Sequence, residues 1–457
     1  HHTTPWLTER HGYDPTYLEI GNKIKNLSSY LINHGIKNSD VIAVILKKGH
    51  EQLVAALGIS YSGAVYAPIE YDLPIERVTY MLNIIQAKLV ITDTDTISKI
   101  NKDDFKIPCK DINCIEQNFD LGSISPRYQS EDSVFAIIFT SGSTGNPKGV
   151  YLKQKGVINC LQFTNQHLGI TKEDRILSIT NICHDMSIYD LYGFFICGGT
   201  IIFPSENTSK DPQYWISIIK KYNVTFWESV PTIIEMLLVE LESGLLKDNE
   251  LPSLKNIILG GEFLKPSLCK RIKKYAINAT IYNTGGPTET TIWNIFHKIT
   301  EEDIVKNHIP YGKPIWNTKY LILNDLLEIA PIGVPGVIYN SGVGIAKGYS
   351  DPKITREKFI FHHDLQLWIY NTGDMGRYTE QGEIDILGRI DSQVKINGKR
   401  IELEEIRNRI TEYPGISDAV VKYDNRLKLI IAFYVGNKEA SREKITAYLL
   451  KHLPRYM

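Results

Sequence analysis

Short apolar runs alternate with helical patterns along most of the chain. Residues 41–46, Val-Ile-Ala-Val-Ile-Leu, read as a buried strand, and residues 51–57, Glu-Gln-Leu-Val-Ala-Ala-Leu, read as a helix. Further strands are predicted at residues 89–92, 198–203, 224–227 and 257–259. Alternation of this kind predicts an α/β fold with a largely parallel sheet.

The pattern changes in the last third of the chain. Residues 331–348 combine short apolar runs with many glycines and two prolines, which is typical of a β subdomain. After residue 391 a compact unit is predicted, with a hairpin that turns through Asn397-Gly398. Helices are expected at 403–409 and 442–452 and strands at 419–421 and 429–433. We therefore predict a large N-terminal core of residues 1–390 and a small, mobile α+β lid of residues 391–457.

Composition narrows the class of protein. At 457 residues the chain is too long for a single core. The 51 Lys and Arg residues balance 52 Asp and Glu residues, which argues against nucleic acid or an anionic membrane as the main partner. No apolar run approaches a bilayer span, no signal peptide is visible, and the six cysteines form no C-x-x-C pair. We expect reduced thiols and a cytoplasmic location.

The most informative stretch is residues 138–149, Ile-Phe-Thr-Ser-Gly-Ser-Thr-Gly-Asn-Pro-Lys-Gly. Its glycines allow the backbone to curl so that several N–H groups point at one anion, and its hydroxyls add donors. Lys148 adds a positive charge. The spacing differs from the common P-loop, G-x-x-x-x-G-K-[ST]. We interpret the stretch as a loop that wraps a polyphosphate; in isolation, a flexible surface linker is the alternative.

Six further stretches occur in the order found in one family. They are residues 64–68 (Ala-Val-Tyr-Ala-Pro), 184–190 (His-Asp-Met-Ser-Ile-Tyr-Asp), 283–289 (Asn-Thr-Gly-Gly-Pro-Thr-Glu), 342–349 (Gly-Val-Gly-Ile-Ala-Lys-Gly-Tyr), 370–374 (Tyr-Asn-Thr-Gly-Asp) and 388–402. With these segments the chain resembles the adenylate-forming superfamily, and within it the adenylation domains of nonribosomal peptide synthetases. The resemblance implies an acetyl-CoA synthetase-like fold. It also implies an enzyme that converts an amino acid and ATP into aminoacyl-AMP and pyrophosphate, then passes the acyl group to the phosphopantetheine thiol of a peptidyl carrier domain.

The resemblance also implies which residues hold ATP and Mg²⁺. A carboxylate must attack the α-phosphorus although two anions repel, so the site must neutralise charge and align the pair. Glu289 is the implied Mg²⁺ ligand. The residues implied in catalysis are Thr140, Lys148, Thr288 and Glu289. The ATP-binding residues implied are Thr140, Ser141, Gly142, Ser143, Thr144, Gly145, Lys148, Gly285, Gly286, Thr288, Asp374 and Arg389.

Each of these assignments has a plainer alternative. The Pro-Thr-Glu sequence before residue 290 could simply start a helix, and Asp185 could be a helix N-cap. Asp374 could belong to a surface ion pair worth about 0–1 kcal/mol, and so could Arg389. The resemblance favours ribose or phosphate binding for this last pair, and contact with the substrate's α-ammonium for Asp185.

A second implied set surrounds the substrate side chain: His184, Asp185, Met186, Tyr189, Glu228, Ile258, Gly260, Thr284, Ile292 and Trp293. Tyr189 and Trp293 fill space, which predicts a small substrate. Glu228 in a half-apolar pocket needs a partner, or its pKa rises and it stays protonated. A short diamino acid would suit it, whereas other features resemble cysteine-activating domains. The alternative is that Glu228 points away to a neighbouring Lys or Arg.

Three departures from the family pattern stand out. His184 occupies a position that is usually aromatic. Gly285 replaces the Tyr that normally stacks on adenine, so either another ring covers the base or the base is held by its edges. The chain reaches Leu453–Met457 without the family's later Asn-Gly-Lys loop, so we expect the lid to be truncated at its end.

Asp391 lies where the family places a hinge, so we expect the lid to rotate between the two half-reactions. A small MbtH-like helper protein is a possible further partner. Two other readings remain open: an acyl-CoA ligase for an acid without an amino group, and a nucleotide-binding module with weakened catalysis.

Overall fold

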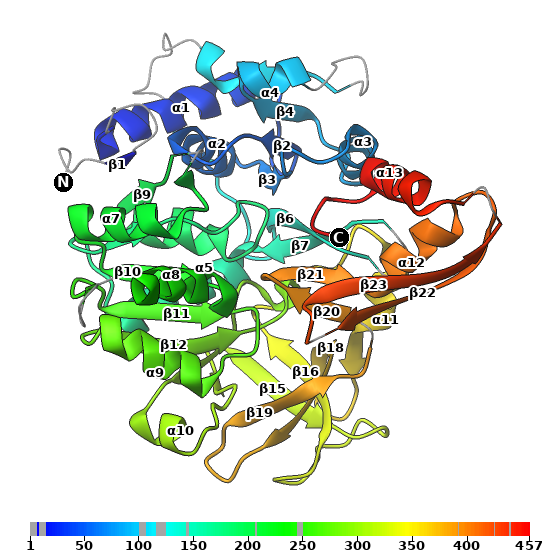
Figure 1. Cartoon of the computed structure of the whole chain (residues 1–457). Helices are drawn as coiled ribbons and strands as arrows, with labels where there is room; N and C mark the ends of the chain where they lie inside the picture. The colour runs from blue at the N-terminus through cyan, green and yellow to red at the C-terminus, as the bar shows by residue number, and fades with distance from the viewer. Residues whose placement is uncertain are drawn as a thin grey trace.

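The computed structural model describes residues 7–8, 15–99, 107–115, 125–142, 146–205, 208–244, 250–391, 393–424, 426–437 and 440–457. Three sheets and their helices make up most of the described chain, and a smaller group of elements follows residue 391 (Figure 1).

The first sheet has the strand order β5-β4-β2-β3-β6-β7 and is parallel except at its β6–β7 edge. Its strands β2, β3 and β4 are almost wholly buried, as strands covered on both faces must be. The strands are β2 (Val41–Ile45), β3 (Val65–Pro68), β4 (Leu89–Thr92), β5 (Cys109–Asp111), β6 (Val134–Thr140) and β7 (Lys148–Lys153). The accompanying helices are α1 (Tyr17–Asn33), α2 (His50–Tyr61), α3 (Ile75–Ile84) and α4 (Thr94–Lys99), and the 3-10 turn η1 (Ile112–Cys114) follows β5.

The second sheet runs β1-β9-β8-β10-β11-β12-β13-β14, parallel up to β12 and antiparallel beyond it. Its strands are β1 (Leu7–Thr8), β8 (Arg175–Leu177), β9 (Thr200–Phe203), β10 (Phe226–Ser229), β11 (Asn256–Gly260), β12 (Thr280–Gly285), β13 (Ile295–Lys298) and β14 (Lys313–Pro314). The helices in this region are α5 (Gln154–Leu168), the π-turn η2 (Tyr189–Gly193), α6 (Phe194–Cys197), α7 (Pro212–Tyr222), α8 (Pro231–Ser243), α9 (Pro266–Tyr275), the 3-10 turn η4 (Thr288–Thr290) and α10 (Glu301–Val305).

The third sheet is antiparallel and is the predicted β subdomain. Its order is β15-β16-β18-β17, with β19 paired to β18. Its elements are β15 (Thr318–Leu323), β16 (Gly336–Gly342), α11 (Pro352–Lys358), β17 (Phe359–His362), β18 (Leu367–Tyr378) and β19 (Ile384–Arg389).

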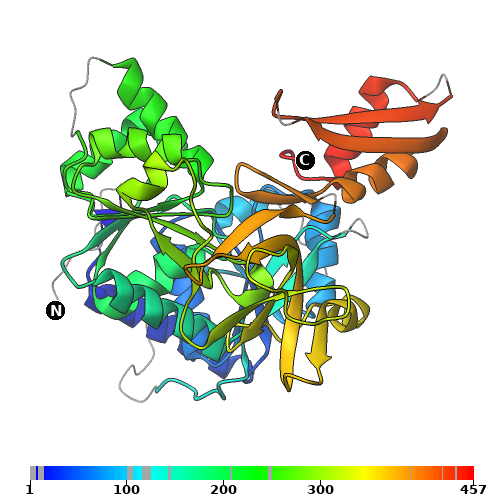
Figure 2. The same ribbon diagram turned by 90° about the horizontal axis from the view of Figure 1, so that it is seen from below.

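The segment after residue 391 has a small core of its own. Strands β20 (Gln393–Ile396) and β21 (Lys399–Glu402) pair through Asn397 and Gly398, whose φ angles of 50° and 74° match a two-residue hairpin turn. Its remaining elements are α12 (Leu403–Thr411), β22 (Ile416–Asp424), β23 (Leu429–Gly436) and α13 (Arg442–His452). Their apolar side chains pack with each other around Ile401, Ile406 and Ile410. Figure 2 shows these orange and red elements to one side of the rest of the chain.

The structure confirms the predicted fold class. Predicted strand 89–92 and helix 442–452 match β4 and α13 residue for residue, and the other predicted elements differ mainly at their ends. None of the six cysteines, which all lie in the described part of the chain, forms a disulfide bond. Among the described helices, none has the length and apolar character needed to cross a bilayer.

Candidate active site

The candidate site lies where parallel strands of both large sheets end. Strand β6 ends at Thr140, β11 at Gly260 and β12 at Gly285. Ligands of open α/β sheets bind outside the carboxyl ends of the strands, because the loops there diverge and leave a crevice.

Two adjoining clefts open at this edge. The one that we call the main cleft encloses about 680 Å³ of space, part of which is open solvent at its mouth. Its walls include His184, Asp185, Met186, Gly260, Thr284, Gly285, Gly286, Thr288, Ile292, Trp293, Tyr311, Asp374, Arg389, Lys395 and Arg400. The second, which we call the side cleft, shares His184, Asp185, Thr288 and Arg400 with the main cleft and adds Thr140 and Ser141.

The loop between β6 and β7 borders the side cleft. The Ser141 hydroxyl donates to the Arg400 carbonyl at 2.8 Å, and the buried Thr140 hydroxyl has no hydrogen-bond partner. Lys148 pairs with Thr140 across the ladder, and its Nζ lies 4.4 Å from the centre of the Tyr349 ring. Burial, and then the charge of Arg400, lower the pKa of the Lys148 ammonium to about 8 against the opposing effect of Glu289. The predicted loop residues Ser143, Thr144 and Gly145 lie outside the described residues.

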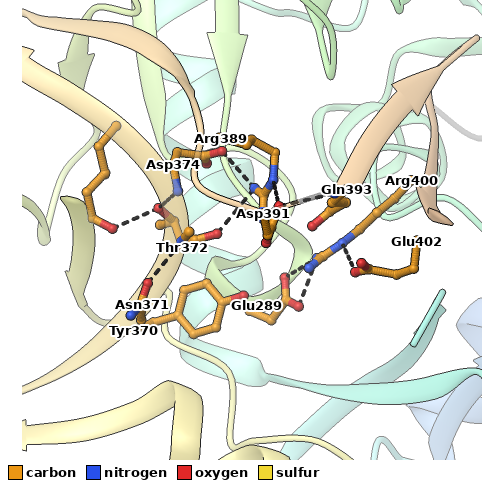
Figure 3. Close-up of polar contacts among 12 residues, drawn as sticks. Glu289, Tyr370, Asn371, Thr372, Asp374, Arg389, Asp391, Gln393, Arg400 and Glu402 are labelled. Carbon is orange, nitrogen blue, oxygen red and sulfur yellow. Dashed lines mark hydrogen bonds and ion pairs between the residues drawn. The ribbon is translucent and has the colours of Figure 1, made fainter. Parts of the chain in front are cut away.

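Glu289 is fully buried and forms an ion pair with Arg400 (Figure 3). The Nη1 atom of Arg400 lies 2.9 Å from its Oε1 and 3.0 Å from its Oε2, and the Tyr349 hydroxyl donates to Oε1 at 2.6 Å. Burial alone would raise the pKa of the Glu289 carboxyl, but Arg400, Lys148 and Tyr349 together lower it to about 2. The carboxylate is therefore held ionised in a place that excludes water.

Arg389 joins Asp374 to Asp391. Its Nη1 donates to Asp374 Oδ1 at 2.7 Å, while Nε and Nη2 donate to the two Asp391 oxygens at 2.7 and 2.6 Å. Asp374 is on β18 and follows Gly373, a residue of the same strand with a φ of +75°. Figure 3 shows the three side chains in one row beside the Glu289–Arg400 pair.

Asp185 lies at the junction of the two clefts. It is 4% exposed, and its Oδ1 accepts from the Met186 N–H at 2.8 Å and lies 3.1 Å from His184 Nδ1. The other ring nitrogen of His184 lies 3.1 Å from the Gly398 carbonyl, in the β20–β21 turn. His184 therefore connects Asp185 to the segment after residue 391.

The bulky residues of the predicted side-chain pocket form a rigid wall. Trp293 is 1% exposed and its indole N–H donates to Thr164 at 2.9 Å, and the Tyr189 hydroxyl donates to Asn165 at 2.8 Å. The two rings lie 5.1 Å apart, centre to centre. Side chains fixed in this way cannot swing aside for a large ligand.

Glu228 does not line either cleft and belongs to a buried charged cluster. It is 1% exposed and is electrostatically coupled to Asp190, whose Oδ2 lies 3.8 Å from Lys48 Nζ. Ser178 donates to Asp190 at 2.7 Å. Burial, and then Asp190, raise the pKa of the Glu228 carboxyl well above its usual range, and burial lowers the pKa of Lys48 to about 8. One proton shared by the two acids and one charge on the lysine balance the cluster.

The described residues contain no group of three or more His, Cys, Asp or Glu side chains that could hold a metal ion. Glu289 alone fits the predicted role, because Mg²⁺ in phosphate-transfer sites is bound by one or two carboxylates together with the substrate's phosphates.

The structure brings most of the predicted residues to the two clefts. Six residues predicted to bind ATP or the substrate side chain are described but line neither cleft: Gly142, Lys148, Tyr189, Glu228, Ile258 and Glu289. Of these, Glu289 contacts Arg400, which lines both clefts. Sequence reasoning missed Arg400, Lys48 and Tyr311. The groups that give them their place in the site, Glu289, Asp190 and Gly285, are each distant from them in the sequence. The charge-rich hairpin sequence was the only signal for Arg400.

Comparison with known proteins agrees with this geometry. The AMP-binding enzyme family matches residues 3–350. The polyketide synthase PksN of Bacillus subtilis (strain 168) is 34% identical over 455 residues, which is 97% of this chain and 8% of that protein. The chain thus spans a small part of this much longer relative.

Two solved structures share the fold. FmoA3, a nonribosomal peptide synthetase solved with α-methyl-L-serine-AMP, is 30% identical with a TM-score of 0.79 over 85% of this chain and 43% of that chain. PA1221, described as a synthetase protein with adenylation and PCP domains, has a TM-score of 0.86 at 24% identity, over 99% of this chain and 77% of that chain. The chain belongs to the AMP-binding enzyme family. Its predicted resemblance to the adenylation domains of nonribosomal peptide synthetases is confirmed.

The low pKa of Glu289 gives a first testable prediction. A Glu289→Gln variant imitates the protonated carboxyl, so it should be less stable than the wild type at pH 7, by up to about 3 kcal/mol at about 1.4 kcal/mol per pKa unit. The difference should be full above the ordinary pKa of 4.5 and shrink as the pH falls toward about 2. Urea unfolding midpoints between pH 7 and 3 measure it.

Glu402 provides the matched control, because burial raises the pKa of its carboxyl although Arg400 lies 3.9 Å away. Glu402→Gln should therefore be relatively more stable than the wild type at pH 7, and that advantage should vanish at low pH. If the stability of both variants relative to the wild type changed in the same direction with pH, the assignment of charges would be wrong.

Proposed function

We propose that this chain activates a small amino acid with ATP, forms aminoacyl-AMP and pyrophosphate, and then transfers the aminoacyl group to the phosphopantetheine thiol of a carrier domain. The observation that carries the proposal is that Asp185 and Asp374 line the same cleft. One buried carboxylate suits an α-ammonium group, and the other, next to Gly373 on β18, suits two ribose hydroxyls. A ligand with both groups is an aminoacyl adenylate.

The charges around the cleft fit the first half-reaction. A substrate carboxylate oxygen forms a bond to the α-phosphorus, the bond from that phosphorus to the bridging oxygen breaks, and pyrophosphate leaves. Lys148 and the hydroxyls of Thr140 and Ser141 would face the phosphates, and Thr288 would donate to the α-phosphate. Preorganised donors of this kind stabilise the developing charge more than water does. FmoA3, 30% identical, was also solved with AMPPNP, an ATP analogue.

Glu289 would hold the Mg²⁺ that accompanies the phosphates, and the metal would supply further neutralising charge there. Arg400 contacts both Glu289 oxygens in this structure, and the Ser141 hydroxyl is engaged by the Arg400 carbonyl. We infer that the β20–β21 hairpin withdraws for adenylation and returns once Mg²⁺ and pyrophosphate have left. Because Arg400 Nη1 contacts both Glu289 oxygens, a metal ion on this carboxylate would have to displace the guanidinium from at least one of them.

The division into residues 1–390 and 391–457 follows from this alternation, with Asp391 as the hinge. Arg389 holds both oxygens of Asp391, so the pair would fix the orientation described here. In the second half-reaction the carrier's thiol gives up its proton, its sulfur attacks the acyl carbon, and AMP leaves. The side cleft gives such a thiol a path to Asp185 from the surface.

The substrate side chain is proposed to be small and uncharged. Trp293 closes the cleft, and a Cβ on Gly260 would lie 3.0 Å from the Thr284 carbonyl. Because Glu228 already shares a proton with Asp190 beside Lys48, it has no need of a cationic substrate, which favours a cysteine-like or similar small amino acid over a diamino acid. The FmoA3 ligand, α-methyl-L-serine-AMP, is also small.

The proposed partner in the second step is a carrier domain. PksN is about twelve times the length of this chain, and PA1221 carries a PCP domain next to its adenylation domain. An MbtH-like helper protein stays a prediction.

Exchange of radiolabelled pyrophosphate into ATP tests the proposal over a panel of amino acids and of the matching acids without an amino group. We expect exchange with small amino acids and little with aromatic ones. The rate of amino-acid-dependent exchange should fall at least about 100-fold in an Asp185→Ala variant, since truncating one member of a buried pair costs roughly 3–5 kcal/mol. The exposed Asp364→Ala variant is the control. Exchange driven equally by acids lacking the amino group would refute the role of Asp185.

The hinge is tested by Asp391→Pro, which fixes φ at residue 391. Aminoacyl transfer to a carrier domain should slow more than pyrophosphate exchange, by roughly 10-fold or more, because one orientation becomes hard to reach. Asp391→Ala removes the contact with Arg389 without fixing φ, so it separates the ion pair from the hinge. An equal loss in both half-reactions of the proline variant would argue against a hinge.

A further inference from the structure

The tip of the Tyr311 ring occupies the space in which a side chain at position 285 would lie. A Cβ built on Gly285 would be 2.3 Å from both Cε2 and the hydroxyl oxygen of Tyr311, and 2.6 Å from Cζ. Real Cβ atoms do not approach other atoms so closely. The φ of Gly285 is not positive, so the backbone does not require glycine at this position. Gly285 is therefore explained by the space that the Tyr311 ring needs.

Tyr311 is held firmly by the elements around it. Its N–H donates to the Ile384 carbonyl at 2.7 Å, and its ring packs edge-on against Tyr320 with centres 6.1 Å apart. Its hydroxyl interacts electrostatically with the Tyr320 hydroxyl and the Gly286 backbone. Burial, and then the charge of Asp374, raise the pKa of the hydroxyl above its ordinary value, so the group stays neutral. A neutral ring fixed in this way offers a preformed surface.

The position of Tyr311 in the cleft indicates what that surface meets. Tyr311 and Trp293 are the large aromatic side chains among the described residues that line the main cleft. Trp293 belongs to the amino-acid end, where it packs on Tyr189. Tyr311 lies at the other end, with Gly285, Gly286 and the proposed ribose carboxylate Asp374. A nucleotide bound through its ribose at Asp374 would direct its base to this end.

We propose that Tyr311 supplies the aromatic wall of the adenine subsite, and that Gly285 is the space that admits its ring. The inference rests on the proposed function, since it requires ATP in the main cleft. A purine has a large π-face, and stacking on a fixed aromatic ring holds such a face strongly.

The experiment compares Tyr311→Leu with Tyr311→Phe in the purified protein. Leucine keeps apolar packing but removes the π-face, so the Kd for ATP by titration calorimetry should rise roughly 5- to 100-fold, the range that stacked bases lose on truncation of the ring. Phenylalanine keeps the ring, so the Kd for ATP of Tyr311→Phe should be at least about fivefold lower than that of Tyr311→Leu. The KM for the amino acid in pyrophosphate exchange should change far less than the Kd for ATP. Fluorescence of 2-aminopurine riboside triphosphate should be quenched on binding to the wild type and less so in the leucine variant.

Tyr378→Ala provides a matched control, because Tyr378 packs in the same apolar cluster as Tyr311 but does not line the cleft. It should lower stability without changing the Kd for ATP. A second test moves the ring: Gly285→Tyr alone should weaken ATP binding through the clash, and Gly285→Tyr combined with Tyr311→Ala should recover binding relative to either single variant.

The outcomes separate this inference from the proposed function. An unchanged Kd for ATP in Tyr311→Leu, with amino-acid-dependent exchange intact in the wild type, overturns the role of Tyr311 and leaves the proposed function standing. A wild type that binds ATP but shows no exchange with any amino acid overturns the proposed function instead. Equal effects of Tyr311→Leu and Tyr378→Ala on the Kd would mean that Tyr311 acts only through packing, and would also overturn the inference.

Discussion

The site depends on one buried carboxylate, Glu289, whose negative charge must always be compensated by positive groups. Glu289 has no exposure to solvent, and Arg400, Lys148 and Tyr349 hold it ionised in this structure. An isolated ionised carboxylate in such a place would be too costly, because burial strips its hydration. Whatever enters the phosphate end must therefore replace one set of positive charges with another. This exchange connects the position of the β20–β21 hairpin to the contents of the cleft.

The same principle of internal charge balance recurs at the two other ends of the site. Arg389 spans two carboxylates, and Lys48 faces an acid pair that shares a proton. In both clusters a cation offsets part of the negative charge before any ligand arrives. A ligand is then selected by the groups that it must displace, as well as by those that it contacts. The exception is Asp185, a buried carboxylate beside a histidine, which is the place where a substrate cation has most to contribute.

Much of the fold could be predicted because strands buried on both faces are continuous apolar runs. Residues 41–46 and 89–92 were recognisable for that reason, and Asn397-Gly398 marked its hairpin through the turn that it requires. Motif order placed Asp185, Thr288 and Asp374 at one cleft. The pairing of Glu289 with Arg400 and of Lys48 with Asp190 could not be read from the chain, because neither partner has a local signature and only tertiary packing brings them together. The sequence also left open whether Glu228 pointed into the pocket, since burial decides that and burial is a property of the assembled sheets.

The contact between Gly285 and the Tyr311 ring has a consequence for how such a site could change over time. Only one of the two positions can hold a large side chain, because a Cβ at position 285 would overlap the Tyr311 ring. Small residues at both positions would leave a cavity in the wall. A lineage that exchanged one arrangement for the other would have to pass through an ancestor with a crowded or an empty wall. Either intermediate would lose packing or space at this wall, so we expect related chains to carry bulk at one of the two positions and seldom at both or neither.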